Sequence, residues 1–309
     1  MQLEKIQWFS GVDNLGLNLV VAQPDGGEIK GVIQILHGMC EHIMRYRPMM
    51  EYFTARGYVV AGNDHRGHGE SVWNQEDLGF FYEDTGTGVV RDAVSITQYL
   101  KDRFPGVPVT LFGHSMGTLV ARVYLQKNDR LVDRVVLSGA PCKNILAPIA
   151  LLLTNIITLI HGEKYRSKLL YTLSVGAFDK RFETEGRSAW LSANTDNVER
   201  YKEDPACGYI FTCNGYRNLF LLLDNTYKRK YRLRNPELPI YFMAGACDPV
   251  IGSEAAWEKA QDALRMAGYE NVDGKLYMGL RHEIFNEEKP ERCFEDMLKF
   301  IEGSVTFSG

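Results

Sequence analysis

Short apolar runs, typical of buried strands, alternate along this chain with longer stretches of helical periodicity. The predicted strands span residues 30–38, 57–64, 108–113 and 133–139, and the predicted helices between them span 46–57, 88–104 and 116–128. Nearly continuous apolar strands separated by helices indicate a parallel sheet covered by helices on both faces. The first 22 residues predict an antiparallel hairpin instead, because Gly11, Asn14 and Gly16 interrupt them. We therefore expect an α/β fold with a mostly parallel central sheet.

The same alternation returns near the end of the sequence. Strands are predicted at 238–248 and 274–280, followed by helices at 253–267 and 290–303. Residues 142–235 contain helical stretches and many aromatic side chains but no clear buried strand. The simplest interpretation is a core formed by 1–141 and 236–309, with 142–235 inserted as a mostly helical cap.

The composition is that of an ordinary soluble enzyme, with 45% hydrophobic and 24% charged residues in a chain of 309. The net charge of −4 gives no electrostatic reason to expect a nucleic acid as partner. The chain starts without a basic segment followed by an apolar one, and its six cysteines form no CxxC pair. We therefore expect mostly buried cysteines, no metal site and a cytoplasmic location. The sequence carries no signal for an oligomeric state.

The longest apolar stretch, residues 144–160, is interrupted by Pro148 and Asn155. It falls short of the roughly 18 uninterrupted apolar residues that indicate a membrane-spanning helix, so no stable membrane anchor is expected. Three roles remain open for its main part, Ile145–Ile160. It can serve as a lid over an acyl-binding pocket, pack within the insertion, or make reversible contact with a lipid surface.

A serine between two glycines stands where a predicted strand changes abruptly into a predicted helix. Residues 113–117, Gly-His-Ser-Met-Gly, match the G-x-S-x-G pattern of a nucleophile elbow. Such a turn lifts the serine hydroxyl clear of the backbone, and glycines at the flanking positions avoid collisions with neighbouring elements. The helix that follows directs backbone N–H groups toward whatever the serine attacks. Ser115 is therefore the predicted catalytic nucleophile.

A serine hydroxyl needs a base and an acid that orients this base, in the chain order serine, acid, histidine. Two histidines follow Ser115, and His282 is the predicted base because it follows the last predicted strand, whereas His161 ends the apolar stretch of the insertion. Asp248 is the predicted acid because it closes the strand 238–248. Its rival Asp273 precedes Gly274, which favours a turn residue.

Two backbone N–H groups are predicted to stabilise the oxyanion, those of Met116 after the nucleophile and Met39 in the loop after the first parallel strand. His37, Cys40 and His42 of that loop match no common metal-ligand spacing, and His37 is expected to brace the loop by hydrogen bonding. Residues 63–71 lack the lysine of a phosphate-binding loop and are interpreted as a tight structural loop near the site.

Together these segments resemble the α/β-hydrolase superfamily, and within it the monoacylglycerol lipase and lysophospholipase-like serine hydrolases. "LHGMCEHIMRY" is similar to the His-Gly-x-x-Glu-His-x-x-Arg-Tyr oxyanion segment of that group, and "DHRGHGES" to its Asp-x-x-Gly-His-Gly-x-Ser loop. "FGHSMGT", "GACDPV" and "RHEIFNE" resemble its elbow, acid and histidine segments. The resemblance implies hydrolysis of carboxylic esters, often lipid-like, beneath a helical cap that follows the sixth strand. Cys40 stands where such loops often carry glycine, and the cap is longer than minimal lipase caps, so the substrate remains open.

The expected reaction is attack of Ser115 on a small-molecule acyl ester through an acyl-enzyme, with no metal or organic cofactor. Cleavage of amides, peptides or thioesters would use the same three residues. Epoxide and haloalkane chemistry is disfavoured, since the members that perform it resemble this fold with aspartate at the elbow. A non-catalytic ligand-binding member of the fold is a further alternative.

Overall fold

The computed structural model describes residues 1–228 and 231–304. Within them, one eight-stranded sheet has the spatial order β1-β2-β4-β3-β5-β6-β7-β8. The strands are β1 (Gln2–Phe9), β2 (Gly16–Gln23), β3 (Gly31–Leu36), β4 (Tyr58–Asn63), β5 (Val109–His114), β6 (Arg134–Ser138), β7 (Ile240–Gly245) and β8 (Val272–Tyr277). The pairs β1–β2 and β2–β4 are antiparallel, and the other neighbouring pairs are parallel. The predicted α/β fold class and the N-terminal hairpin are confirmed.

Successive residues of the central strands enter two different apolar cores. Val32 and Leu36 of β3 lie in one core, and Ile33 and Ile35 lie in the other. The first core includes residues of α2 (Gly88–Arg103), α3 (Met116–Asn128) and α9 (Glu254–Arg265), and the second includes residues of α1 (Arg47–Thr54) and α10 (Glu291–Ile301). Because side chains alternate between the two faces of a sheet, strands covered on both faces have no polar side. This burial explains their continuous apolar runs.

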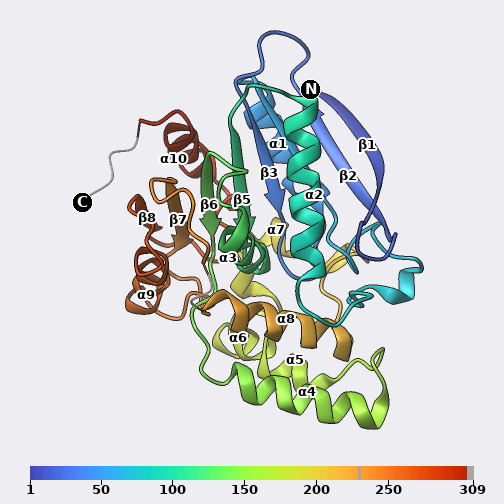
Figure 1. The fold of residues 1–309 in the computed structure, drawn as a ribbon. Coiled ribbons are helices and arrows are strands. Elements are labelled where there is room, and N and C mark those ends of the chain that lie inside the picture. The colour runs from blue at the N-terminus through green and yellow to red at the C-terminus, as the bar shows by residue number, and fades with distance from the viewer. Residues whose placement is uncertain (229–230, 305–309) are drawn as a thin grey trace.

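The described chain between β6 and β7 forms helices and loops without a strand. Its helices are α4 (Ala147–His161), α5 (Lys168–Leu173), α6 (Gly176–Arg181), α7 (Thr195–Glu203) and α8 (Cys213–Thr226), with short 3-10 turns at Glu183–Glu185 and Ala189–Leu191. Helix α8 contacts both α3 and α4. Figure 1 shows α4, α5, α6 and α8 gathered beyond the ends of the central strands. Parallel sheets bind ligands at the carboxyl ends of their strands, and these helices lie next to those ends.

One local prediction near the end of the sheet is wrong. Strand β8 begins at Val272, and Asp273 lies within it, opposite Tyr241 of β7, rather than in a turn. Gly274 belongs to the same strand, and the ring of Trp257 in α9 packs directly against it. A Cβ at Gly274 would lie 2.8 Å from that ring. The glycine therefore reflects a close helix–sheet contact and not a turn.

Candidate active site

Ser115 lies at the turn between β5 and α3, in a backbone conformation that few L-residues adopt. Its φ is 50° and its ψ is −117°. Close packing requires the flanking glycines, since a Cβ at Gly117 would lie 1.9 Å from the Leu36 carbonyl oxygen and one at Gly113 would lie 2.6 Å from that of Gly117. The Ser115 N–H donates to the Ser138 carbonyl at 2.9 Å. The hydroxyl is thus carried at the start of α3, where backbone N–H groups lack intrahelical acceptors.

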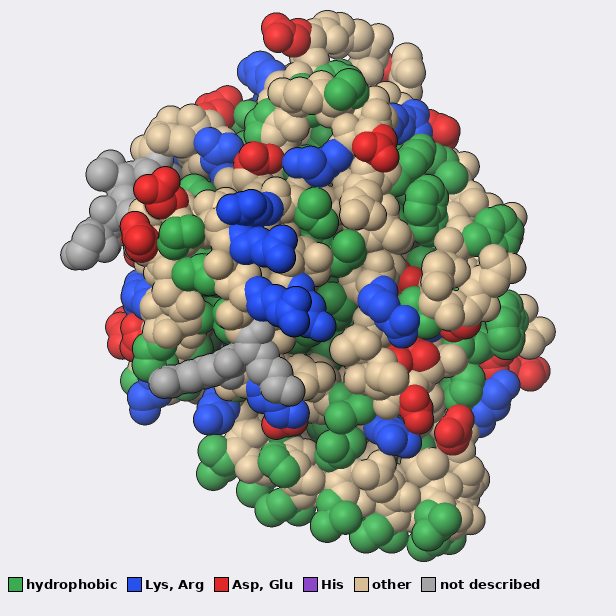
Figure 2. Space-filling model, viewed as in Figure 1, with side chains coloured by type: hydrophobic (Ala, Val, Ile, Leu, Met, Phe, Trp, Pro, Cys, Tyr) green, Lys and Arg blue, Asp and Glu red, His purple; other side chains and the backbone are tan. Residues whose placement is uncertain are grey.

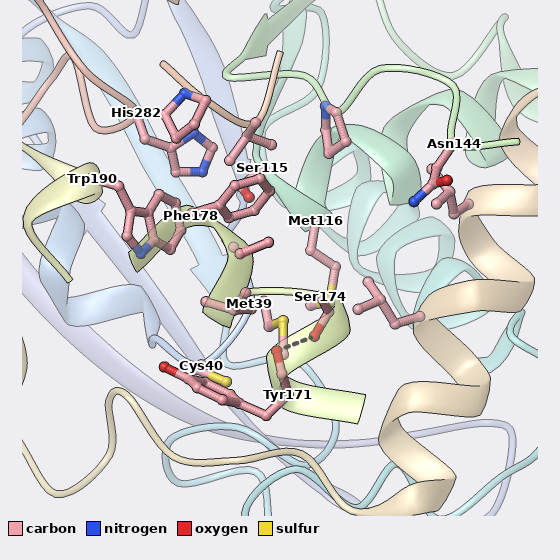
Figure 3. A pocket seen from close by; sticks show the side chains of 18 of the residues that line it. Met39, Cys40, Ser115, Met116, Asn144, Tyr171, Ser174, Phe178, Trp190 and His282 are labelled. Atoms are coloured by element: carbon pink, nitrogen blue, oxygen red, sulfur yellow. Dashed lines mark hydrogen bonds between the residues drawn. The ribbon is translucent and has the colours of Figure 1, made fainter. Parts of the chain in front are cut away.

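The loops after β7 and β8 bring Asp248 and His282 together. His282 Nδ1 and Asp248 Oδ2 are 2.8 Å apart, and both side chains are buried. The second carboxylate oxygen accepts the Val250 N–H at 2.8 Å, which fixes the carboxylate plane. Gly139, with φ 60°, leaves room for the imidazole, because a Cβ there would lie 2.9 Å from the His282 ring. Figure 3 shows the His282 ring and the Ser115 side chain at the same cavity.

Two neighbouring histidines at this site have opposite protonation behaviour. Burial by itself lowers the pKa of His282, but the charge and hydrogen bond of Asp248 outweigh it and raise this pKa above the ordinary 6.5. The His114 ring lies 4.6 Å from the His282 ring. Burial, with a further contribution from the charge of His282, lowers the pKa of His114 to about 4. At neutral pH, His114 is therefore uncharged and only His282 is suited to hold a proton.

A cavity of about 720 Å³ lies in front of Ser115. The core contributes the apolar side chains of Met39, Met116 and Leu119, and the inserted helices contribute Leu153, Phe178 and Leu219, among others. The volume falls within the range of pockets for small organic ligands. Figure 3 shows side chains of the insertion, including Tyr171 and Phe178, around the same cavity as Met116. The site is therefore a mainly apolar chamber with polar groups near the serine.

The loop that carries Met39 is held by the insertion. Cys40 has φ 54°, in the left-handed region that favours glycine. Its carbonyl accepts the Gly208 N–H at 3.1 Å, and its Sγ donates to the Tyr209 carbonyl at 3.0 Å. Within residues 1–228 and 231–304 the Met39 N–H has no protein acceptor. Met39 and Met116 both line the cavity, as Ser115 does.

A buried ion-pair network behind the site joins the loop that carries Met39 to the loop that carries His282. The Glu41 carboxylate accepts the Gly38 N–H and binds Arg45 Nη1 at 2.8 Å. Arg45 also makes two hydrogen bonds to Glu283, of 2.6 and 2.7 Å, and Asn197 Nδ2 donates to Glu283 at 2.7 Å. Burial alone would raise the pKa of the Glu283 carboxyl, but the Arg45 charge outweighs it and lowers that pKa. Because Glu283 directly follows His282, the hydrogen bonds to Glu283 fix the backbone next to His282.

The sequence motifs contain Glu41, Arg45 and Glu283 of this network, but no role was predicted for them. The one signal that could have pointed to the network is Glu283, a charged side chain directly after the predicted base His282, in a loop at the end of a strand. Arg45 and Glu283 are 238 positions apart, and nothing in either segment indicates that they pair.

The structural roles predicted for two loops are confirmed. His37 Nδ1 contacts the adjacent carbonyl of Gly38, and its Nε2 accepts the His65 N–H, both at 2.8 Å. Within the loop 63–71, the fully buried Arg66 binds Asp92 at 2.8 Å. These hydrogen bonds hold both loops at the carboxyl edge of the sheet.

The rival site residues are not brought to the cavity. His161 is the last residue of α4, is exposed, and stacks on Tyr165 with ring centroids 4.4 Å apart. Asp273 lies near the amino end of its strand, whereas Asp248 follows the carboxyl end of β7. The structure therefore favours Asp248 and His282 over both rivals.

The apolar segment of the insertion has two different sides. Leu153 lines the cavity, and Ala150 packs with it against the apolar cluster beneath the insertion. Leu152 and Leu159, by contrast, are 61% and 88% exposed. Figure 2 shows hydrophobic side chains along the edge of the molecule where α4 lies. Packing within the insertion therefore explains one side of α4 only. No helix among the described residues is long and apolar enough to cross a membrane.

The strand order, the serine at a strained strand-to-helix turn and the buried histidine–aspartate pair define an α/β hydrolase. The chain belongs to the family described as serine aminopeptidase S33, whose model matches residues 27–289.

Comparisons with individual proteins agree with this assignment. The chain is 28% identical over 297 residues to a monoacylglycerol lipase of Mycolicibacterium smegmatis, covering 95% of both chains. It is 27% identical over 267 residues to a monoglyceride lipase homolog of Monkeypox virus, covering 84% of this chain and 83% of the relative. A thermostable carboxyl esterase from Bacillus coagulans, solved with glycerol, shares the fold with a TM-score of 0.88 at 23% identity, covering 98% of this chain and 99% of that one. The resemblance inferred from the motifs is confirmed.

Proposed function

We propose that this protein is a serine hydrolase that cleaves carboxylic esters of lipid-like acyl groups, with monoacylglycerols and lysophospholipids as its substrate class. One observation carries the proposal: Ser115 and His282, which is paired with Asp248, line the same mainly apolar cavity. The names of the relatives support the same chemistry. An apolar chamber next to a nucleophile is suited to a substrate that joins a hydrocarbon chain to a reactive carbonyl.

In the proposed mechanism Ser115 Oγ attacks the ester carbonyl while His282 Nε2 accepts its proton. The Asp248 carboxylate holds His282 Nδ1–H and stabilises the imidazolium that forms. The N–H groups of Met39 and Met116 donate to the developing oxyanion. His282 then protonates the leaving alcohol, and a water molecule attacks the acyl-enzyme with the same proton transfers.

We further propose that residues 142–235 act as a cap whose inner side binds the acyl chain. Phe178 and Leu219 come from different helices of this segment and line the same cavity as Ser115. An acyl chain placed among them leaves water, at about 0.8 kcal/mol for each buried methylene. The cap would thereby favour long acyl chains over short ones.

Labelling with a fluorophosphonate probe tests the nucleophile, and a substrate panel tests the class. We expect stoichiometric labelling of the parent and of Ser304→Ala, an exposed position far along the chain, but not of Ser115→Ala. The panel contains monoacylglycerols and lysophospholipids of several chain lengths, with matched amides, thioesters and peptides. Labelling without turnover of any ester would contradict the proposed function, and faster cleavage of the amides or peptides would replace it.

The pH dependence of hydrolysis follows from the raised pKa of His282. The base must be neutral, so kcat/KM should fall as the pH drops through this pKa, with a midpoint above 6.5. Asp248→Asn removes the largest contributions that raise this pKa while the burial that lowers it stays, so the midpoint should move to lower pH while kcat falls by about 10⁴-fold. The exposed Asp262→Asn should leave the profile unchanged. An unshifted midpoint in Asp248→Asn would contradict this role of Asp248.

Polar substitution inside the cap should change the preference for chain length. In Leu153→Asn we expect kcat/KM to fall about tenfold or more for long acyl esters but little for an acetyl ester, because only a long chain reaches this side chain. Asn155→Ala, on the exposed side of the same helix, is the matched control. If Leu153→Asn leaves the ratio of long-chain to short-chain rates unchanged, the cap does not bind the acyl chain there.

The outer side of α4 is proposed to make reversible contact with lipid surfaces. Leu152 and Leu159 expose apolar area that a lipid interface would cover. The double variant Leu152→Ser/Leu159→Ser should reduce co-sedimentation with phospholipid vesicles about tenfold and slow hydrolysis of vesicle-bound ester, while its rate on a water-soluble ester stays that of the parent. Equal vesicle binding by the variant and the parent would contradict this contact.

A further inference from the structure

Three metal-ligating side chains from the core and the insertion converge at residues 37–42, named here the oxyanion loop because it carries the proposed oxyanion donor Met39. His42 is the last residue of this loop, and Asp204 and Cys207 belong to the turn after α7. His42 Nε2 and Asp204 Oδ2 are 2.8 Å apart, and one ligand atom from each of the three residues lies within 4.8 Å of the other two. The histidine and the aspartate are separated by 162 positions, so the sequence gives no indication of this cluster. We propose that His42, Asp204 and Cys207 form a site for a thiophilic divalent cation such as Zn²⁺.

The ligand types and spacing suit tetrahedral zinc. Zinc in proteins binds imidazole nitrogen and carboxylate oxygen at about 2.0–2.2 Å and thiolate sulfur at about 2.3 Å, often with a water molecule as fourth ligand. Such bonds hold neighbouring ligand atoms about 3.3–3.8 Å apart. When a metal binds, the distance of 2.8 Å between His42 Nε2 and Asp204 Oδ2 would therefore increase by about 0.5 Å. The widest separation among the three ligand atoms, within 4.8 Å, would decrease by about 1 Å.

The turn that carries two of the ligands is already ordered. The Cys207 N–H donates to the Asp204 carbonyl at 2.9 Å, and the Ala206 N–H donates to Asp204 Oδ1 at 2.8 Å. The remaining carboxylate oxygen faces His42. A chelating pair held by its own backbone loses little further freedom when a cation binds. The half-exposed Asp204 gives a cation access from solvent, while Cys207 is buried.

The local charge also favours a cation. The Arg45 guanidinium is shared by the carboxylates of Glu41 and Glu283, so these three groups together carry one net negative charge. Asp204 adds another. On binding, the Cys207 thiol gives its proton to solvent as the sulfur–metal bond forms. The His42 Nε2 proton that faces Asp204 is also released to solvent, and the ring keeps or takes up a proton on Nδ1, so that the Nε2 lone pair binds the metal. Burial raises the pKa of the Cys207 thiol, so the metal must displace a proton that is otherwise retained.

Occupancy of this site would clamp the insertion to the oxyanion loop. Gly208 N–H already donates to the Cys40 carbonyl, Cys40 Sγ donates to the Tyr209 carbonyl, and His42 contacts Asp204. A bound cation would replace the last of these contacts by metal bonds that also engage Cys207. It would raise resistance to unfolding without taking part in ester cleavage.

Titration with Cd²⁺, which reports thiolate bonding by ultraviolet charge-transfer absorption, tests the site. The exposed Cys247 is first replaced by serine to remove a competing thiol. We expect one equivalent of Cd²⁺ with a thiolate band, displacement by Zn²⁺, and a rise of about 5 °C in the thermal midpoint at Zn²⁺ well above Kd. Cys207→Ser should lose the thiolate band, and Asp204→Asn should weaken Cd²⁺ binding about tenfold or more. The buried control Cys213→Ser should keep the thiolate band and the Cd²⁺ affinity of the Cys247→Ser protein.

The proposal is overturned if the Cys247→Ser protein shows no thiolate band, if Cys207→Ser keeps it, or if Zn²⁺ leaves the thermal midpoint unchanged. Should Cys207→Ser fail to fold, Asp204→Asn and His42→Gln carry the test through their Cd²⁺ affinities. Ester hydrolysis by the metal-free protein is measured separately, so failure of this site leaves the proposed function unaffected.

Discussion

Replacing Ser115 by alanine is expected to lower kcat for ester hydrolysis by about 10⁵–10⁶-fold while the protein stays folded. Alanine keeps the Cβ and the backbone demands of the turn, so φ of 50° is no harder to hold than in the parent. Only the hydroxyl is removed, and with it the acyl-enzyme. Any remaining rate would come from the oxyanion donors and from binding.

Three measurements establish the Ser115→Ala result. Steady-state hydrolysis of a long-chain monoacylglycerol gives kcat, circular dichroism and the thermal midpoint report folding, and equilibrium binding of a non-hydrolysable analogue reports the intact cavity. Ser304→Ala should match the parent in all three. A folded Ser115→Ala protein that retains more than a few per cent of kcat would exclude Ser115 as the nucleophile.

Replacing Arg45 by methionine is expected to destabilise the protein by about 3–5 kcal/mol. Methionine fills much of the same volume but leaves the buried carboxylates of Glu41 and Glu283 facing each other without a cation. The stacking of Arg45 over the Tyr201 ring, at 4.9 Å from its centroid, is lost as well. Since Glu41 holds the Gly38 N–H and Glu283 adjoins His282, kcat should fall with stability.

Chemical denaturation of Arg45→Met measures this loss, and Arg47→Met is the matched control. Arg47 forms an ion pair with Glu51 whose two side chains are 59% and 54% exposed, so its removal should change stability by less than about 0.5 kcal/mol. Adding Glu283→Gln to Arg45→Met should recover part of the lost stability, because one unpaired carboxylate is removed. Equal stabilities of Arg45→Met and Arg47→Met would show that the buried network contributes nothing.

The sheet and the positions of the three proposed catalytic residues could be predicted because their signals are local. Continuous apolar runs identify strands buried on both faces, and chemistry-bearing residues that follow such strands meet at one edge of the sheet. Ser115, Asp248 and His282 each lie at such a strand end. The elbow added a further local signal in its two glycines, of which Gly113 is required by its contact with Gly117 and Gly117 by its contact with Leu36 of β3.

Features that depend on contacts between distant segments could not be predicted. The Arg45–Glu283 pair joins two loops whose separate sequences show only ordinary surface-like charges. The sequence also could not predict which side of α4 is buried and which is exposed. The helix is apolar nearly all round, so its periodicity does not distinguish the two sides. Asp273 was misplaced for a related reason, since the Trp257 ring that explains its neighbouring glycine comes from another element.

The hydrogen bonds that join Cys40 to Gly208 and Tyr209 divide the insertion into two parts with unequal freedom to vary. Helices α4 to α6 contribute walls of the chamber, so exchanging them alters which substrates fit. The turn around residues 204–209 instead supports the loop that carries a proposed oxyanion donor. A chimera that receives a foreign cap should therefore keep this turn, or the transplant will lose turnover along with its old selectivity.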